Sequence, residues 1–228
     1  QPLDEDMEKG RKKNPNIFYV GSDPTYEGRC QAEIAEDLFS SLESLSSRYD
    51  RNADGTIQLA LLKGEIGHQD SEKRSSSFLD TLRKDNYRYE VLNSPYCNWN
   101  RQTAKNHMAE MMEKYGDKLE LLACNNDDMA LGAIDYLLEN GYVDKDDNLP
   151  FPILGVDGTD IGISYLKKGY LYGTVKNDGE KQADCCLRIS EDILKYGKLG
   201  EDFPYEMKNE YTIYVEGEKM VRKEKESE

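Results

Sequence analysis

The sequence has few cysteines, no long hydrophobic run and a shortage of positive charge, and each shortage excludes a class of protein. Its 5 cysteines are an odd number with no Cys-x-x-Cys pair, so a disulfide framework is not expected. The longest apolar runs reach only about four residues, far short of the roughly 20 needed to span a bilayer. With 30 Lys and Arg against 45 Asp and Glu, the net charge of −15 disfavours nucleic acids and anionic membrane surfaces.

The cysteines have an ordinary structural interpretation. Cys30, Cys124, Cys185 and Cys186 each lie beside an apolar pattern typical of a helix or strand. A cysteine in such a place is usually a small buried hydrophobic residue, so we expect these four to be buried.

The two ends of the chain are polar. The opening segment QPLDEDMEKGRKKNP has no apolar stretch of a signal peptide and is typical of an internal linker, so we expect a further segment to precede it. The closing segment VRKEKESE is expected to be solvated. Between these ends, the length of 228 residues suits one large domain or two modest ones.

Short apolar runs alternate with helical patterns along most of the chain. Strands are expected at residues 17–20, 57–62, 87–92, 119–124, 153–156 and 171–175. Helices are expected near residues 26–49, 71–84, 102–115, 127–140, 159–168 and 179–196. Such alternation predicts an α/β fold, with open parallel sheets flanked by helices, in which ligands bind beyond the carboxyl ends of the strands.

The most specific motif is a loop of calcium-binding type between Asp50 and Gln58. Oxygen-bearing side chains stand at positions 1, 3, 5 and 9 (Asp50, Asn52, Asp54 and Gln58), a glycine stands at position 6, and the carbonyl of Thr56 falls at position 7. These places match the first nine of an EF-type loop. The alternative is a plain Asp-Gly turn with solvated acids.

The loop lacks its usual last ligand. Position 12 is Leu61, which cannot bind calcium, so the bidentate carboxylate must come from elsewhere. Glu120, at the start of the run LELLAC, is the best-placed donor if that run forms the neighbouring strand. Because no second helix follows the loop, we expect a structural ion rather than a calcium signal.

Polar side chains follow the ends of several expected strands. They are His68, Asp70 and Arg74, then Trp99, then Asn125, Asn126 and Asp127, then Asp157, and finally Asn177 and Asp178. Carboxylates, amides, an imidazole, a guanidinium and an indole suit a polyhydroxylated ligand, because each hydroxyl both donates and accepts and a sugar ring stacks on an indole. The residue types therefore favour a sugar.

Four motifs carry a family resemblance. They are DRNADGTIQLALLKGEIGHQDSEKR, LELLACNNDDMALGA, ILGVDGTD and LYGTVKND, in order along residues 17–215. The chain resembles the bacterial galactose/glucose-binding proteins, the type I periplasmic substrate-binding components of sugar ABC transporters. The resemblance implies two lobes that close over a monosaccharide.

The resemblance implies specific site residues. The sugar would be bound by His68, Asp70, Arg74, Trp99, Asn126, Asp157 and Asn177. Calcium would be held by Asp50, Asn52, Asp54, Thr56, Gln58 and Glu120. Taken singly, His68 could instead cap a turn, Trp99 could be a core aromatic and Asp157 could cap a helix, and spacing does not decide between Asn125 and Asn126.

The resemblance also implies that the first lobe is incomplete. Residues 1–22 and 177–214 would be a remnant of the N-terminal lobe, and residues 23–176 and 215–228 the C-terminal lobe with the calcium loop and half of the sugar site. The remnant would keep a strand at 17–20, the helix after Asn177 and a strand near 211–215. A separate N-terminal fragment would complete it. We expect this chain alone to bind sugar weakly and to keep calcium binding.

The implied partners are galactose or glucose, a transporter permease and, in some relatives, a chemotaxis or sensor receptor. The implied location is extracytoplasmic, in the periplasm or tethered as a lipoprotein to a Gram-positive cell. Three alternatives stay open: a glycosidase using His68, Asp70 and Asp157, a sugar-sensing regulator, and a calcium-regulated module. No activated nucleophile motif supports the enzyme and no basic helix-turn-helix supports the regulator. The sequence does not distinguish galactose from glucose.

Overall fold

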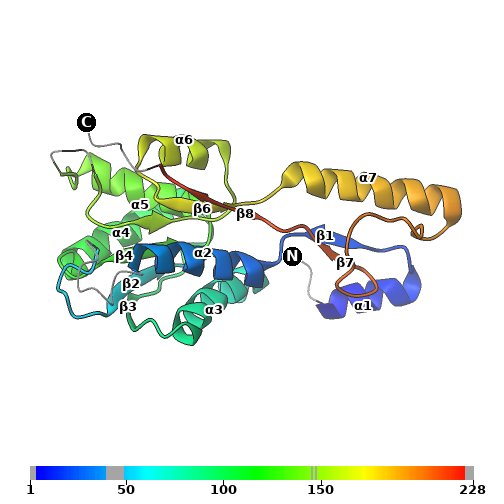
Figure 1. Ribbon diagram of the computed structural model, residues 1–228, viewed down its shortest axis with the longest axis horizontal. Coiled ribbons are helices and arrows are strands. Elements are labelled where there is room, and N and C mark those ends of the chain that lie inside the picture. Colours follow the sequence, from blue (N-terminus) through cyan, green and yellow to red (C-terminus); the bar gives the residue numbers. More distant parts are fainter. Residues whose placement is uncertain (1–3, 40–48, 145, 147, 224–228) are drawn as a thin grey trace. The chain divides into compact units, whose positions relative to one another are not determined.

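A computed structural model describes residues 4–39, 49–144, 146 and 148–223, and it divides the chain into two compact units. Unit 1 comprises residues 1–23 and 177–218, and unit 2 comprises residues 24–176 and 219–228. Figure 1 shows the elements of both units.

Unit 2 is a parallel sheet between two layers of helices. Its strands are β2 (Ile57–Leu62), β3 (Tyr89–Asn93), β4 (Leu121–Cys124), β5 (Ile153–Leu154), β6 (Gly173–Lys176) and β8 (Glu218–Val221), whose first residue falls at the unit boundary. Its helices are α2 (Pro24–Phe39), α3 (Gln69–Lys84), α4 (Arg101–Tyr115), α5 (Asp127–Glu139) and α6 (Asp160–Lys168). The strand order is β3-β2-β4-β5-β6-β8, and the pairs from β3 through β6 are parallel.

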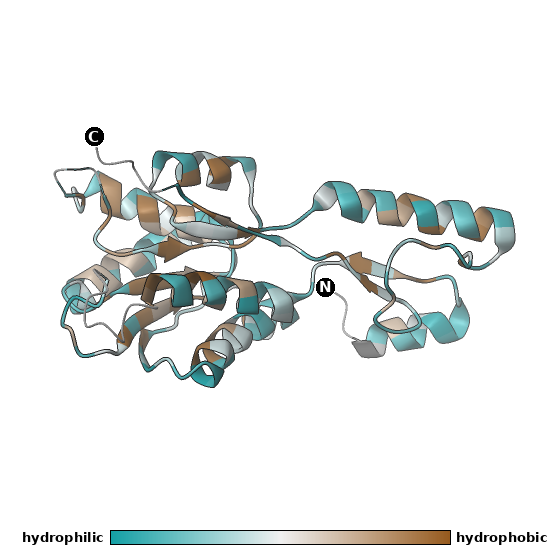
Figure 2. Cartoon of the chain, in the orientation of Figure 1, coloured by the Kyte–Doolittle hydropathy of each residue, from teal (hydrophilic) through white to brown (hydrophobic). Residues whose placement is uncertain are grey.

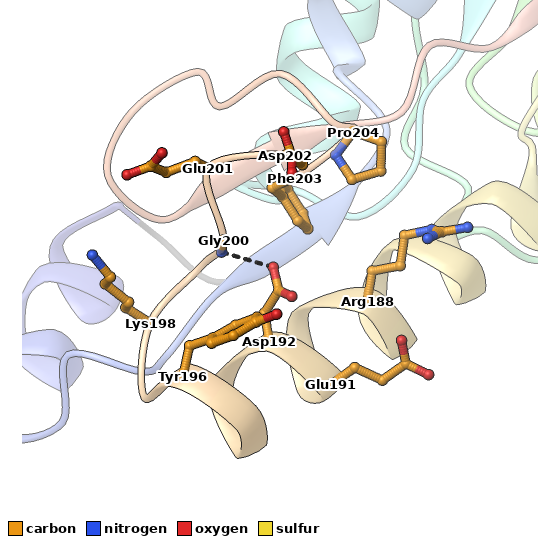
Figure 3. A pocket seen from close by; sticks show the side chains of 10 residues that line it. All are labelled: Arg188, Glu191, Asp192, Tyr196, Lys198, Gly200, Glu201, Asp202, Phe203 and Pro204. Carbon is orange, nitrogen blue, oxygen red and sulfur yellow. Dashed lines mark hydrogen bonds between the residues drawn. The ribbon is translucent and has the colours of Figure 1, made fainter.

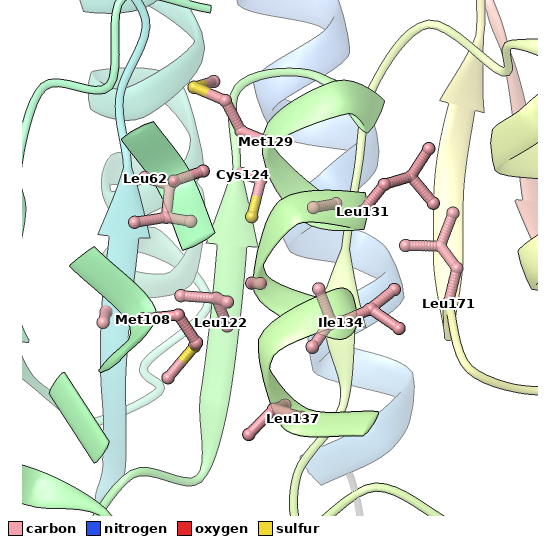
Figure 4. Close-up of a cluster of buried hydrophobic side chains, with 14 of the residues drawn as sticks. Leu62, Met108, Leu122, Cys124, Met129, Leu131, Ile134, Leu137 and Leu171 are labelled. Carbon is pink, nitrogen blue, oxygen red and sulfur yellow. The ribbon is translucent and has the colours of Figure 1, made fainter. Parts of the chain in front are cut away.

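The alternation of side chains along β2 explains why helices cover both faces of this sheet. Ile57, Leu59 and Leu61 pack with α2 and α3, whereas Ala60 and Leu62 pack with α4 and α5. Successive residues of a strand point to opposite faces, so an unbroken apolar run is buried on both sides. Figure 4 shows the second of these clusters, where Leu62 and Leu122 meet Met108 and Ile134.

Polar residues at the strand ends start the helices that follow. The side chains of Asn100, Asn126 and Thr159 accept hydrogen bonds from Thr103 N, Met129 N and Gly162 N at 2.9, 2.9 and 3.0 Å. Such caps satisfy the first free N–H groups of a helix. The same edge of the sheet therefore carries both the helix caps and the loops that can hold a ligand.

Unit 1 contains a two-stranded parallel sheet of β1 (Tyr19–Gly21) and β7 (Thr212–Tyr214). Its helices are α1 (Asp4–Lys13) and α7 (Gly179–Tyr196). Cys185 and Ile189 of α7 are buried with Ile213 of β7. Figure 2 shows hydrophobic residues gathered on the strands, while hydrophobic and hydrophilic residues alternate along α7.

Three expectations about local structure were wrong. The polar opening segment is not only a linker, because α1 forms there, with Arg11, Lys12 and Lys13 in its last turn, where positive charge suits the helix dipole. Val221 belongs to β8 rather than to a solvated tail, and Arg222 N donates to Tyr172 O at 2.9 Å. The rest of the expected tail, residues 224–228, lies outside the described residues. Cys186 is exposed, whereas Cys30, Cys124 and Cys185 are buried.

The helix expected over residues 26–49 is described only in part. It appears as α2, which ends at Phe39, and residues 40–48 lie outside the described residues. No helix in the part of the chain that the structure describes is long and apolar enough to cross a membrane.

Candidate functional site

The carboxyl ends of β2, β3, β4 and β5 meet at one edge of the unit 2 sheet. Leu62 at the end of β2 pairs in parallel register with Cys124 at the end of β4, and Ala123 pairs with Leu154. The segments that follow these strands carry six of the seven residues predicted to bind sugar: His68, Trp99, Asn126 and Asp157 in the loops or at their ends, and Asp70 and Arg74 in the first turns of α3. Direct contacts join His68 to Trp99, and Arg74 to Trp99 and Asp157.

Trp99 is held against the loop that follows β2. Cys97 N donates to Lys63 O at 2.7 Å and Asn98 N to Gly64 O at 3.1 Å, so the two loops run together. Asn98 and Trp99 then have φ values of 52° and 59°, in the left-handed region that non-glycine residues rarely adopt. A Cβ atom on Gly64 would overlap the indole ring, so the ring packs directly on the backbone there. Trp99 is half-buried and packs partly on the core, so its ring is held in place at this edge of the sheet.

His68 lies edge-on to Trp99 and also starts α3. The two ring centroids are 5.1 Å apart, with an angle of 78° between the ring planes. His68 Nδ1 accepts a hydrogen bond from Asp70 N at 3.2 Å. This bond assigns the proton of the neutral ring to Nε2, so Nε2–H is the donor that a ligand oxygen can use. The capping interpretation of His68 and a ligand role are therefore compatible.

Arg74 is buried and is held by three groups. Its Nε donates to Glu27 Oε2 at 2.6 Å, and its Nη1 donates to the carbonyl of Asn125 at 2.7 Å. Asp157 Oδ1 lies 3.8 Å from the same Nη1. The guanidinium carbon lies 5.9 Å from the centre of the Trp99 ring. Arg74 therefore links the indole to two acidic residues.

The two predicted acidic sugar ligands differ in environment. Burial raises the pKa of Asp157 to about 7, although Arg74 opposes this shift. Asp157 adopts a φ of 113°, and its N donates to Val175 O at 2.9 Å. Asp70 Oδ1 is buried and has no hydrogen-bond partner among the described residues. Such an oxygen is costly to leave unsatisfied and suits a ligand hydroxyl.

The structure distinguishes the adjacent Asn125 and Asn126. Asn125 Oδ1 accepts from Gly64 N and from Ser71 Oγ, each at 3.0 Å, so its side chain is used inside the protein. The Oδ1 of Asn126 caps α5 by accepting from Met129 N, and its Nδ2 donates to no acceptor within the described chain. The amide hydrogens of Asn126 are thus available to a ligand.

Asn177, the seventh predicted residue, belongs to unit 1. Within that unit, Ser22 Oγ donates to Asn177 Oδ1 at 2.8 Å.

Sequence reasoning gave no site role to Glu27 and treated Asp127 only as one of the polar residues after β4. Asp127 is fully buried, and its Oδ2 accepts from Thr159 N at 2.7 Å while its Oδ1 accepts from Thr174 Oγ1 at 2.7 Å. It therefore fixes the loop that contains Asp157. The sequence held one signal for this role of Asp127, which is its position directly after Asn126 at the start of an expected helix.

The predicted calcium loop is closely folded on itself. Gly55 N donates to Asp50 Oδ2 at 2.9 Å, Thr56 N to Asp54 Oδ1 at 2.7 Å, and Gln58 Nε2 to Asp54 Oδ2 at 3.0 Å. Asn52 Nδ2 lies 3.0 Å from Asp54 Oδ2 and 3.3 Å from Gln58 Oε1. The side chains of the loop thus hydrogen-bond to one another and to the loop backbone.

Glu120 reaches this loop from the neighbouring strand edge. Its Oε1 accepts from Arg51 N at 2.7 Å, and its Oε2 accepts from Gln58 N at 3.2 Å. Burial raises the pKa of Glu120, while these backbone donors lower it. Among the residues that the structure describes, no three His, Cys, Asp or Glu side chains are gathered closely enough to form a metal site by themselves. A calcium ion would therefore need the amide and carbonyl oxygens as well, which is the donor mixture that calcium accepts.

A separate pocket of about 330 Å³ lies within unit 1, between α7 and the segment that follows it. Figure 3 shows Tyr196 and Phe203 on its walls and Asp192 accepting a hydrogen bond from Gly200 N at 2.8 Å. None of the residues predicted to bind sugar or calcium lines it.

Residues 4–199 match the family described as periplasmic binding protein domain. The chain is 31% identical over 193 residues to the D-galactose/methyl-galactoside-binding periplasmic protein MglB of Haemophilus influenzae. The matched region covers 84% of this chain and 55% of that protein. It is 27% identical over 170 residues to a xylitol-binding protein of Mycolicibacterium smegmatis, and this second match covers 73% of this chain and 44% of that protein.

Solved structures share the fold. A periplasmic solute-binding protein of an ABC transporter from Actinobacillus succinogenes with bound D-allose superposes with a TM-score of 0.73 at 17% identity, over 97% of this chain and 67% of that chain. A solute-binding protein from Bacillus halodurans with bound myo-inositol gives 0.67 at 21% identity, over 94% of this chain and 63% of that chain. The predicted fold class is confirmed.

The chain spans about half the length of the curated relatives it matches. The family consists of solute-binding proteins rather than enzymes, as predicted. Because the family match covers most of its residues, this chain belongs to the periplasmic binding protein family.

Proposed function

We propose that this chain binds a monosaccharide, galactose or glucose, for delivery to an ABC transporter. The observation that supports this most is the group of His68, Arg74 and Trp99 at the carboxyl edge of the unit 2 sheet, with Asp157 beside Arg74. A sugar needs an apolar surface for its ring and charged donors and acceptors for its hydroxyls. This edge offers both within a few ångströms.

Each side chain has a distinct part in the proposed binding. The indole of Trp99 stacks on one face of the sugar ring. His68 Nε2, Arg74 and the Asn126 amide donate to sugar oxygens, while Asp70 and Asp157 accept from sugar hydroxyls. Galactose and glucose differ at one hydroxyl, and carboxylates such as these accept it in either orientation.

We also propose a structural calcium ion in the Asp50–Gln58 loop. The ligands would be Asp50, Asn52, Asp54, the Thr56 carbonyl, Gln58 and Glu120. The donor chemistry supports it, because these residues offer the six to eight oxygens that calcium takes when Glu120 binds through both oxygens. Calcium would neutralise the negative charges of the loop and tie it to the strand that carries Glu120.

The proposed setting follows from the relatives. MglB is named as a periplasmic protein, and we propose an extracytoplasmic location, either in the periplasm or as a surface lipoprotein. The proposed partner is the permease of a sugar transporter. Signalling to a chemotaxis or sensor receptor is the second candidate, and no contact in the described chain favours it.

Tryptophan fluorescence provides a direct test. The sequence contains 1 tryptophan, so the emission of this chain reports on Trp99 alone. Titration with D-galactose and D-glucose up to high millimolar concentrations should give a saturable change, and sucrose at matched osmolarity should give none. A linear response that is the same for all three sugars would contradict the proposal. Glycosidase activity is tested in parallel with an aryl galactoside, for which no hydrolysis is expected.

A further inference from the structure

Glu27 is a buried carboxylate in unit 2 that makes none of the proposed contacts with the sugar. It lies on α2 and is 1% exposed, whereas the residue whose charge it meets, Arg74, is 7% exposed and lies on α3. The pair is 47 residues apart in sequence and 2.6 Å apart in space.

Close packing of the two helices brings this pair together. A Cβ atom on Gly28 would overlap the carbonyl oxygen of Arg74, so α2 approaches the backbone of α3 at that point. Glu27, the adjacent residue, is thereby placed beside the Arg74 side chain. A larger residue at position 28 would separate the helices and the charges.

Stability alone is a weak reason for such a pair. Removing two charges from water costs free energy that their attraction often only offsets, and well-packed apolar residues can do as well. The position of the pair indicates another role, because the Arg74 guanidinium lies 5.9 Å from the centre of the Trp99 ring and 3.8 Å from Asp157 Oδ1.

The hydrogen bonds of Arg74 define the orientation of its guanidinium. Nε donates to Glu27 and Nη1 donates to the Asn125 carbonyl, which together fix the plane of the group. Nη2 donates to no acceptor in the described chain. A planar group held on two of its nitrogens presents the third in one direction.

We propose that Glu27 is a positioning residue of the sugar site, which holds the Arg74 guanidinium so that Nη2 donates to a ligand oxygen. This inference rests on the proposed function. Pre-organisation of this kind spares a flexible side chain the entropy cost of ordering when the ligand binds.

The test combines two measurements on the 228-residue chain. Sugar affinity is measured from Trp99 fluorescence with D-galactose and D-glucose for Glu27→Gln, Glu27→Asp and Glu36→Gln. Glu36→Gln is the matched control, because Glu36 lies on the same helix and interacts with Asp85 instead. Exchange of the Arg74 Nε–H with water is measured by NMR in each protein, with the signal assigned from an Arg74→Lys variant.

Glu27→Gln should weaken sugar binding about tenfold or more, since a hydrogen bond between charged groups is lost. Glu27→Asp should recover part of the affinity because it keeps the charge, and Glu36→Gln should bind as the unaltered chain does. The Arg74 Nε–H should exchange slowly in the unaltered chain and rapidly in Glu27→Gln.

Several results would overturn the proposal. Glu27→Gln could bind sugar as tightly as the unaltered chain, or Glu36→Gln could weaken binding equally, which would indicate general damage to α2. If Glu27→Gln does not fold, the unaltered chain still tests the proposal, because rapid exchange of its Arg74 Nε–H would show that Glu27 does not hold the guanidinium. If no sugar binds the unaltered chain, the proposed function fails, while the exchange measurement still decides whether Glu27 holds Arg74.

Discussion

The imidazole of His68 lies edge-on to the indole of Trp99, with ring centroids 5.1 Å apart and ring planes at 78°. One ring comes from the loop after β2 and the other from the loop after β3, 31 residues later along the chain. The contact joins the loops that follow the two neighbouring strands β2 and β3 at the carboxyl edge of the sheet.

Trp99→Leu is expected to reduce sugar affinity by about ten- to a hundredfold, because a stacked aromatic anchor is among the most important groups of a binding site. Isothermal titration with D-galactose checks this, since the variant has no tryptophan emission. Tyr142→Leu, which replaces an exposed aromatic residue far along the chain, is the control. Equal affinity of the two variants would show that the indole does not contact the sugar.

Gly64→Ala is expected to displace the indole of Trp99, because the added Cβ would overlap the ring. The emission maximum should shift to longer wavelength and sugar affinity should fall, while the melting temperature changes by only a few degrees. Gly179→Ala is the matched control, because a Cβ atom there meets nothing within 4 Å. An unchanged emission spectrum in Gly64→Ala would mean that the two loops are not packed together as described.

Asn125 and Asn126 are expected to respond differently to substitution. Asn125→Ala removes acceptors for Gly64 N and Ser71 Oγ in a buried place and should destabilise the protein by about 2–4 kcal/mol. Asn126→Asp keeps the cap on α5 but removes the amide donor, so it should weaken sugar binding with little loss of stability. Denaturant unfolding and fluorescence titration measure the two effects. The reverse pattern would assign the ligand role to Asn125.

The raised pKa of Asp157, about 7, predicts a pH dependence of stability. Burial raises this pKa above that of the unfolded chain. Between about pH 4 and pH 7, the folded protein therefore holds a proton on Asp157 that the unfolded chain has lost. The contribution of Asp157 to stability is therefore unfavourable above pH 7 and is relieved as the pH falls from about 7 toward about 4. Asp157→Asn should remove this relief, on the order of 1 kcal/mol.

Urea unfolding at pH 8 and pH 5 measures the difference between Asp157→Asn and the unaltered chain. Asp80→Asn, at an exposed position of α3, controls for the loss of one negative charge. Sugar binding should have the opposite dependence and strengthen between pH 6 and pH 8, because the ionised carboxylate is the better acceptor. A difference that does not vary with pH would count against a buried, proton-binding Asp157.

Calcium is expected to raise the melting temperature of this chain, and EDTA should reverse the effect. At a calcium concentration about 100 times the dissociation constant, the stabilisation should reach about 2.7 kcal/mol. Glu120→Gln should abolish most of this response, since it removes the carboxylate that reaches the loop from another strand. Asp144→Asn, in a different acidic turn, should keep it. Magnesium serves as the test of selectivity, and an equal response to both ions would argue against the proposed site.

Much of the fold could be predicted from local patterns. The run IQLALL predicted the bounds of β2 as they are found, because a short apolar run between Gly55 and Gly64 favours a buried strand. The expectation for residues 153–156 was less accurate, because the described strand β5 ends at Leu154, before Gly155 and the turn that carries Asp157. Helix α1 was missed because its sequence is polar, and among the side chains described in it Met7 alone is buried, so no apolar stripe indicates the helix.

The sequence by itself determined which residue types stand at the strand ends, and the order of strands and helices that brings those ends to one edge. It did not determine which polar groups serve the protein and which are offered to a ligand. Asn125 and Asn126 are chemically identical, yet one is used by Gly64 and Ser71 and the other caps α5. Glu27 meets Arg74 only because two helices pack at Gly28. Hydrogen bonds between residues far apart in the chain depend on helix packing, and no local pattern records them.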